Sequence, residues 1–319
     1  MRLRTPAAPR ALAAVCLTGL WMTPTPEVFA AEPARQIGTA LASTQTAFYP
    51  GEDLVIKLTF TGAGDDELLI DPAALGREAF TIMDAQGRPP AKISKTEPAM
   101  KAGQAPLSVR GFDTVDRLVN LSSWYPKLSS KTGSWEISWS YGTMKAGPIK
   151  AFVIKAYRPA KDRVARVQTD LGTMTWQMLP EEAPQHVKHF VDLARSGFYD
   201  GLTIFRVVPG VQAEGGDPKG DGTGAWTRMM PAEMSQTIKM GTGMVGAARQ
   251  DTSMTSDSMF FITLSPTEFM RGKQTFYGRL TEGWEVLAKL HPLPTRGDTG
   301  FRDAWMLQNP VKIIRVSIE

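Results

Sequence analysis

Cysteine is almost absent from this 319-residue sequence, because the one cysteine, Cys16, lies near the start of the chain. If the segment around Cys16 is removed, as described below, the remaining chain contains no thiol. That excludes disulfide bonds, thiol catalysis and cysteine metal sites in the rest of the protein. Histidine is also scarce, and all three histidines lie in the second half of the chain.

The chain also lacks a strong charge. Its formal net charge is +4, and residues 1–30 contribute +2 of this through three arginines and one glutamate. The remaining +2 is too mild to indicate a nucleic-acid partner, which requires a clustered basic face. Beyond residue 30, no apolar run approaches the length of a membrane span. We therefore expect neither nucleic acid nor a membrane as a partner once residues 1–30 are removed.

Residues 1–30 are typical of a secretory signal peptide. They begin with three arginines and continue with an apolar run, 11–22, that is too short to span a bilayer comfortably. Val28–Ala30 then provide small residues at the positions that a signal peptidase recognises. An uncleaved membrane anchor is the alternative. The prediction is an exported protein, either periplasmic or secreted.

Residues 37–158 show the alternation of apolar and polar residues that is typical of half-buried strands. Apolar side chains occupy every second position from Leu54 to Phe60 and from Trp135 to Trp139. Short strands separated by turn sequences predict a β-sandwich. The opening of this region, residues 49–65, resembles bacterial immunoglobulin-like modules. We expect a binding or spacer module with room for a protein partner, which the sequence does not identify.

Residues 159–163 are polar and predict a linker, and residues 164–319 combine short strands with two helices. We expect helices at 184–196 and 284–290. Many short strands with two separated helices predict a closed antiparallel β-barrel capped at each end. The strands are expected at 164–170, 173–179, 202–208, 244–248, 259–264, 275–280 and 311–318.

The most informative segment is 204–224, where Arg206 interrupts a short apolar run. A buried arginine is costly unless its guanidinium has a function. The glycine-rich stretch 215–224 allows a close approach of the backbone to a ligand or another strand. It lacks the Gly-Lys-Ser/Thr ending of a phosphate-binding loop. A structural salt bridge beside a tight turn is the alternative reading.

Residues 164–319 contain a series of short motifs, namely Leu171–Thr173, Gly197–Gly201, Phe205–Gly210, Gly215–Pro218, Ala247–Arg249, Phe260–Ile262 and Thr267–Met270. Their order and spacing resemble the cyclophilin family of peptidyl-prolyl isomerases, and Arg249 is similar to the bacterial branch. The resemblance implies a barrel fold, isomerase activity without cofactor or metal, and proline-containing polypeptides as substrates. A monomer is expected.

The same resemblance implies which residues form the active site. Arg206 matches the family's catalytic arginine, and Phe261 matches the phenylalanine at the floor of the proline pocket. An arginine can donate hydrogen bonds to the prolyl nitrogen as the amide twists. The other positions matched to substrate binding are Val211, Gln212, Glu214, Ala248, Arg249, Met259, Phe269, Met270 and Gln274.

Several of these positions depart from the family pattern. Val211 and Gln212 stand where the family usually has phenylalanine and methionine, so the proline slot should be looser. Met259 replaces a glutamine and removes one polar contact to the substrate backbone. The changes to Phe269, Met270 and Gln274 are milder.

Glu214, in place of a glutamine, is the most consequential change. Its carboxylate could hold Arg206 in a bidentate pair or neutralise its charge, and the sequence leaves both readings open. We expect isomerase activity that is reduced. The alternatives are a non-catalytic proline-peptide binder or chaperone on a cyclophilin scaffold, or a protein whose N-terminal module carries the function. His186 and His189 are expected on a solvated helix face.

Overall fold

The computed structural model describes residues 37–45, 47–64, 67–91, 106–223, 229–248, 254–300 and 304–319. The expected signal peptide, residues 1–30, and Arg249 lie outside this part of the chain. Residues 37–319 form one compact unit with two large hydrophobic clusters, one built from residues 37–153 and one from residues 157–318. Within the described ranges, no helix is long and apolar enough to cross a membrane.

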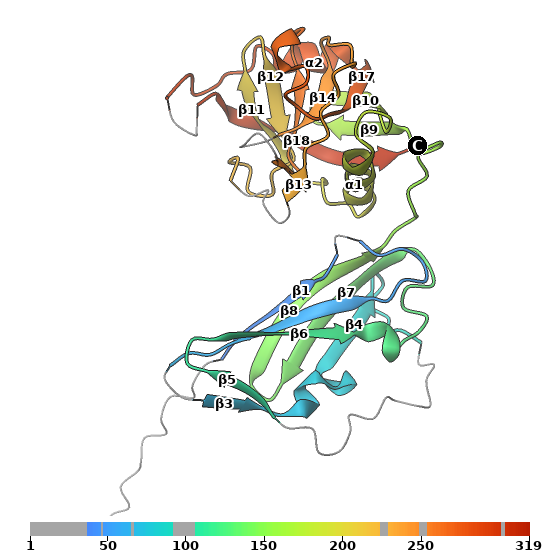
Figure 1. Ribbon diagram of the computed structural model, residues 1–319, viewed down its shortest axis with the longest axis vertical. Coiled ribbons are helices and arrows are strands. Elements are labelled where there is room, and N and C mark those ends of the chain that lie inside the picture. The colour runs from blue at the N-terminus through green and yellow to red at the C-terminus, as the bar shows by residue number, and fades with distance from the viewer. Residues whose placement is uncertain are drawn as a thin grey trace, which may run out of the picture. The chain divides into compact units, whose positions relative to one another are not determined.

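The N-terminal region consists mainly of antiparallel strands (Figure 1), and their buried side chains form the first cluster. Two three-stranded sheets have the orders β1-β2-β6 and β4-β7-β8, and β3 pairs with β5. The elements are β1 (Gly38–Ser43), β2 (Val55–Thr61), β3 (Glu67–Ile70), η1 (Pro72–Leu75), η2 (Arg77–Ala79), β4 (Phe80–Asp84), β5 (Leu107–Arg110), β6 (Thr114–Asn120), η3 (Leu121–Ser123), β7 (Gly133–Tyr141) and β8 (Met144–Val153).

The alternation of apolar residues produces this core as expected. In β2, Ile56, Leu58 and Phe60 are buried while the residues between them are partly exposed. Phe60 packs edge-to-face on Trp139 of β7, with ring centroids 5.6 Å apart. Both three-stranded sheets thus contribute to one cluster. The immunoglobulin-like assignment and the boundaries 37–158, 159–163 and 164–319 stay predictions.

The C-terminal region contains a closed eight-stranded antiparallel barrel, which confirms that part of the expected fold. Around the barrel the strand order is β10-β17-β14-β16-β12-β11-β18-β9. The elements are β9 (Val164–Thr169), β10 (Gly172–Met178), α1 (Pro184–Arg195), β11 (Thr203–Val208), β12 (Gln212–Gly215), β13 (Met229–Pro231), β14 (Met244–Ala247), β15 (Met254–Ser256), β16 (Phe260–Thr263), η4 (Glu268–Met270), β17 (Phe276–Glu282), α2 (Trp284–Leu290) and β18 (Met306–Ile318).

Both expected helices are present, and they lie at separate places on the barrel (Figure 1). Helix α1 begins at Pro184, a residue suited to the first helical position. Its apolar face packs on the barrel core, where Phe190 contacts Trp176 with ring centroids 5.7 Å apart. The helix therefore covers part of the barrel core.

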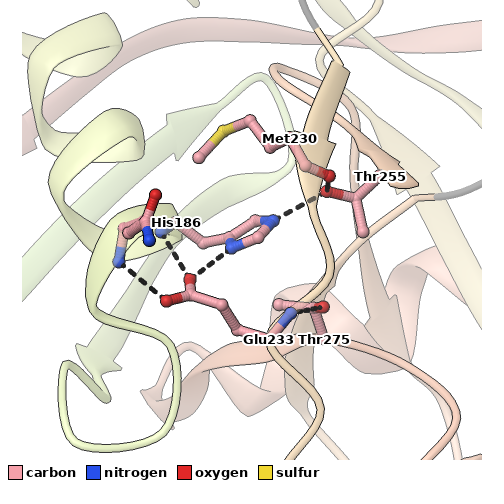
Figure 2. A network of polar contacts seen from close by, with 6 residues as sticks. His186, Met230, Glu233, Thr255 and Thr275 are labelled. Carbon is pink, nitrogen blue, oxygen red and sulfur yellow. Dashed lines mark hydrogen bonds and ion pairs between the residues drawn. The ribbon is translucent and has the colours of Figure 1, made fainter. Parts of the chain in front are cut away.

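The expectation that His186 lies on a solvated helix face is wrong, because its side chain is only 3% exposed. Its Nδ1 lies 2.5 Å from Glu233 and its Nε2 lies 2.7 Å from the Thr255 hydroxyl (Figure 2). The Glu233 carboxylate also accepts hydrogen bonds from the backbone N–H groups of Gln185 and His186. This carboxylate supplies the N-terminal cap that Ala183 cannot provide.

Asp162, in the segment expected to be a linker, is buried and paired. Its side chain is 2% exposed and accepts hydrogen bonds from Arg158 and from Arg195 of α1, each at 2.9 Å. Burial raises the pKa of this carboxyl, but hydrogen bonds from Arg158 and Arg195 outweigh it and lower the pKa to about 2. The charged form is therefore strongly favoured in the folded protein.

Replacing Asp162 with Asn should cost stability in a pH-dependent way. The folded pKa lies below the ordinary value of 3.8, so the stabilisation is present above pH 3.8 and is lost as the pH falls through about 2. We expect the difference in free energy of unfolding between wild type and Asp162→Asn to be about 2 kcal/mol larger at pH 7 than at pH 2. Chemical denaturation across this range measures it. The exposed Asp113→Asn variant is the control, and equal pH dependence in both variants would contradict the prediction.

Candidate active site

Three of the expected site residues form one row across neighbouring barrel strands. Arg206 of β11 pairs with Glu214 of β12, and Glu214 pairs with Phe261 of β16. Directly paired residues project from the same face of a sheet. The residues next to them along each strand belong to the interior core, namely Val207, Ala213 and Ile262. The row therefore lies on the outer face of the barrel wall.

A glycine makes room for the aromatic member of this row. Gly246 of β14 pairs with Phe261, and a Cβ added to Gly246 would lie 2.5 Å from the Phe261 ring and 2.8 Å from the Thr275 carbonyl oxygen. Contacts this short do not occur in real structures, so another residue would displace the ring. The Phe261 ring also packs edge-to-face on Phe276, at 5.5 Å.

The Arg206 guanidinium is held at two of its three nitrogens. Its Nε donates to the Ala304 carbonyl at 2.9 Å, and its Nη1 donates to Glu214 Oε1 at 2.6 Å. Gln212 donates to the same carboxylate oxygen. Among the described residues, none accepts a hydrogen bond from Nη2, and the side chain is 28% exposed. The Nη2 group of Arg206 is therefore a charged donor with a fixed direction that makes no hydrogen bond within the described part of the chain.

An apolar cluster lies beside this row. Phe261, Met270 and the partly buried Val211 pack together with Ile238, Met244 and Phe276. Phe261 is 2% exposed and Met270 is 6% exposed, so most of their apolar surface is already covered by the protein. Little of the apolar surface of Phe261 and Met270 is therefore left to contact a ligand.

The remaining expected residues are placed as follows. Met259 and Ala248 form a second apolar group with Phe205 and Met306. Phe269 is 63% exposed, outside both groups. Gln274 is partly buried, and its Oε1 atom has no hydrogen-bond partner in the described part of the chain. The substrate contacts expected of all these residues stay predictions.

The carbonyl of Ala304 is the site group that sequence reasoning missed. It is a backbone group, and it comes from the connection between α2 and β18, which carries no motif of the resemblance. No residue type could have signalled it.

The arrangement is suited to hydrogen-bond donation to a bound ligand. In the described ranges, no group of three histidine, cysteine, aspartate or glutamate side chains could hold a metal ion. The chemistry available from Arg206 is a fixed positive charge with a directed N–H donor beside apolar side chains.

Comparison with known proteins identifies this half of the chain. Residues 164–318 match the family model for cyclophilin type peptidyl-prolyl cis-trans isomerases. A peptidyl-prolyl cis-trans isomerase of Helicobacter pylori is 35% identical over 148 residues, which cover 45% of this chain and 89% of that protein. One from Schizosaccharomyces pombe is 34% identical over 154 residues, covering 47% of this chain and 94% of that protein.

Two other relatives show the limits of the match. The chain covers only 26% of a peptidyl-prolyl cis-trans isomerase-like 2 protein of Gibberella zeae, at 31% identity. A solved cyclophilin type isomerase of Cryptosporidium parvum has 25% identity and a TM-score of 0.45, covering 49% of this chain and 98% of that one. All these matches cover about half of this chain or less. Through residues 164–318, the chain belongs to the cyclophilin family of peptidyl-prolyl cis-trans isomerase enzymes.

Proposed function

We propose that Arg206 catalyses the rotation of X-Pro peptide bonds in proline-containing polypeptides. The barrier to this rotation is about 18–20 kcal/mol, because amide resonance is lost as the bond twists. The prolyl nitrogen then becomes pyramidal and basic, and a hydrogen bond from Arg206 is strongest at that point. The single observation that carries this proposal is the oriented guanidinium beside an apolar cluster, with an Nη2 that no described residue accepts a hydrogen bond from.

The proline ring would contact Phe261, Met270 and Val211. Two features support an isomerase of reduced activity. The valine side chain offers little apolar area, and Phe261 and Met270 are already covered. In addition, the Glu214 carboxylate lies 2.6 Å from Arg206 Nη1 and offsets its charge in a partly buried site.

The protein itself provides the direct test. Wild type should accelerate cis–trans exchange in a proline peptide, measured by NMR exchange spectroscopy. Peptide binding without any acceleration would favour the alternative function, a non-catalytic proline-peptide binder or chaperone, which the Glu214 carboxylate beside Arg206 also favours.

The Glu214→Gln variant should gain activity. Glutamine can still accept a hydrogen bond from Arg206 while leaving the guanidinium charge uncompensated. We expect kcat/KM to rise about 3- to 10-fold, equivalent to about 0.7–1.4 kcal/mol. Glu285→Gln, an exposed carboxylate on α2, is the matched control. A fall in kcat/KM would show instead that the carboxylate is needed to orient Arg206.

The proposed substrates are exported polypeptides that fold outside the cytoplasm, since residues 1–30 have the pattern of a secretory signal peptide. In this proposal residues 37–158 form an immunoglobulin-like spacer or binding module, residues 159–163 are a linker, and the mature protein is a periplasmic or secreted monomer. Fractionation of cells that express the full chain tests the export, and retention in the cytoplasm would exclude it.

A further inference from the structure

The connection between α2 and β18 is anchored by its own backbone hydrogen bonds. The N–H of Trp305 donates to the Gly297 carbonyl at 2.8 Å, and the N–H of Arg296 donates to the Met306 carbonyl at 2.9 Å. A third bond, from the N–H of Gln308 to the Pro294 carbonyl at 3.0 Å, closes the pairing. Residues 294–297 and 305–308 therefore hold each other without help from Arg206.

Trp305 adopts a backbone conformation that is unusual for its residue type. Its φ is +61°, and within the described ranges it is the one non-glycine residue with positive φ. Bulky side chains disfavour this left-handed region, and it persists only where neighbouring contacts impose it. The contacts are present here, because Trp305 is bonded to Gly297 through its N–H and to Val207 through its carbonyl, at 3.0 Å.

The left-handed turn directs two successive carbonyls at β11. The Trp305 carbonyl accepts from the backbone N–H of Val207, and the Ala304 carbonyl accepts from Arg206 Nε at 2.9 Å. The paired strands are irregular at this point, because Ile204 pairs with Val311 whereas Arg206 pairs with Met306. The irregular part of β18 therefore brings this turn to the base of the Arg206 side chain.

We infer that the left-handed backbone at Trp305 positions the catalytic guanidinium by presenting the Ala304 carbonyl to Arg206 Nε. Glu214 alone would fix Nη1 of Arg206 and leave the plane of the guanidinium free to rotate about that contact. Two acceptors on different nitrogens fix the plane of the guanidinium and hence the direction of Nη2. Trp305 is a positioning residue, which acts through Ala304, and this inference rests on the proposed function of Arg206.

The test compares two substitutions that both remove the indole. Asparagine tolerates positive φ, whereas the β-branched valine does not. Trp305→Gly, which adopts positive φ freely, is the reference. Trp305→Asn should keep kcat within about twofold of this reference. Trp305→Val should lower kcat about tenfold with KM nearly unchanged, as expected for a misplaced catalytic group. Trp305→Ala, intermediate in its tolerance, replaces the valine variant if thermal unfolding shows that the latter is not folded.

A spectroscopic measurement gives a readout that does not depend on turnover. The Arg206 Nε–H group should give an NMR signal protected from solvent exchange in wild type and Trp305→Asn, and exchanging faster in Trp305→Val. Equal kcat values and equal exchange rates in the Asn and Val variants would overturn the inference. An Arg206→Ala variant with wild-type activity would instead overturn the proposed function, while the Nε–H comparison would still decide the positioning.

Discussion

Replacing Arg206 with Ala is expected to lower kcat/KM for a proline peptide by about 10²–10³-fold, the usual cost of removing one preorganised donor to a transition state. The reason is that, in the proposed function, Nη2 donates to the twisted prolyl nitrogen, and no described residue accepts a hydrogen bond from it. NMR exchange spectroscopy measures the rate, and peptide binding is measured on the same samples. Binding should change little, because the apolar cluster around Phe261 is retained.

Two further variants separate the role of geometry from that of charge. Arg206→Lys keeps the positive charge. A lysine ammonium group cannot bind two acceptors and a substrate in one plane as a guanidinium can, so this variant should show less than about a tenth of the wild-type activity. Arg279→Ala removes an exposed arginine from β17 in the same domain and should leave the rate unchanged. Full activity of Arg206→Ala would remove this residue from the mechanism.

Replacing Trp176 with Ala is expected to cost about 3–5 kcal/mol of stability, because it leaves a large cavity in the barrel. Trp176 is fully buried and packs against Phe190 of α1 and, edge-to-face at 5.1 Å, against Phe260 of β16. The variant therefore loses contacts with the helix and with the strand that carries Phe261. Chemical denaturation followed by circular dichroism gives the free energy of unfolding.

Trp176→Phe is the matched control. The indole N–H has no hydrogen-bond partner among the described residues, so phenylalanine forfeits no hydrogen bond and leaves a smaller void. We expect a cost below about 1.5 kcal/mol. If Trp176→Ala and Trp176→Phe were equally destabilised, cavity formation would not explain the effect.

The elements that follow a strong periodic pattern could be predicted from the sequence. Helix α2 was expected at 284–290 and lies at Trp284–Leu290, and β2 buries the expected alternate residues. Strand β12 was not expected, because a four-residue strand that includes Glu214 and Gly215 has neither periodicity nor β-favouring residues. Its pairing with β11 and β16 creates it.

The buried position of His186 shows the same limit. The sequence pattern predicts that a histidine three residues from another on a helix is exposed to solvent. His186 is buried because Glu233 and Thr255, which lie on other elements, provide its hydrogen-bond partners. Those partners lie 47 and 69 residues away along the chain.

The sequence alone predicted the barrel and its two helices, because these follow from the period of apolar residues. It pointed to Arg206 as the proposed catalytic residue only through the resemblance of its motifs to the cyclophilin family. Tertiary structure decided how that arginine is held. Its acceptors are a carboxylate on the neighbouring strand and a main-chain carbonyl 98 residues away, and a carbonyl has no residue type that a sequence could reveal.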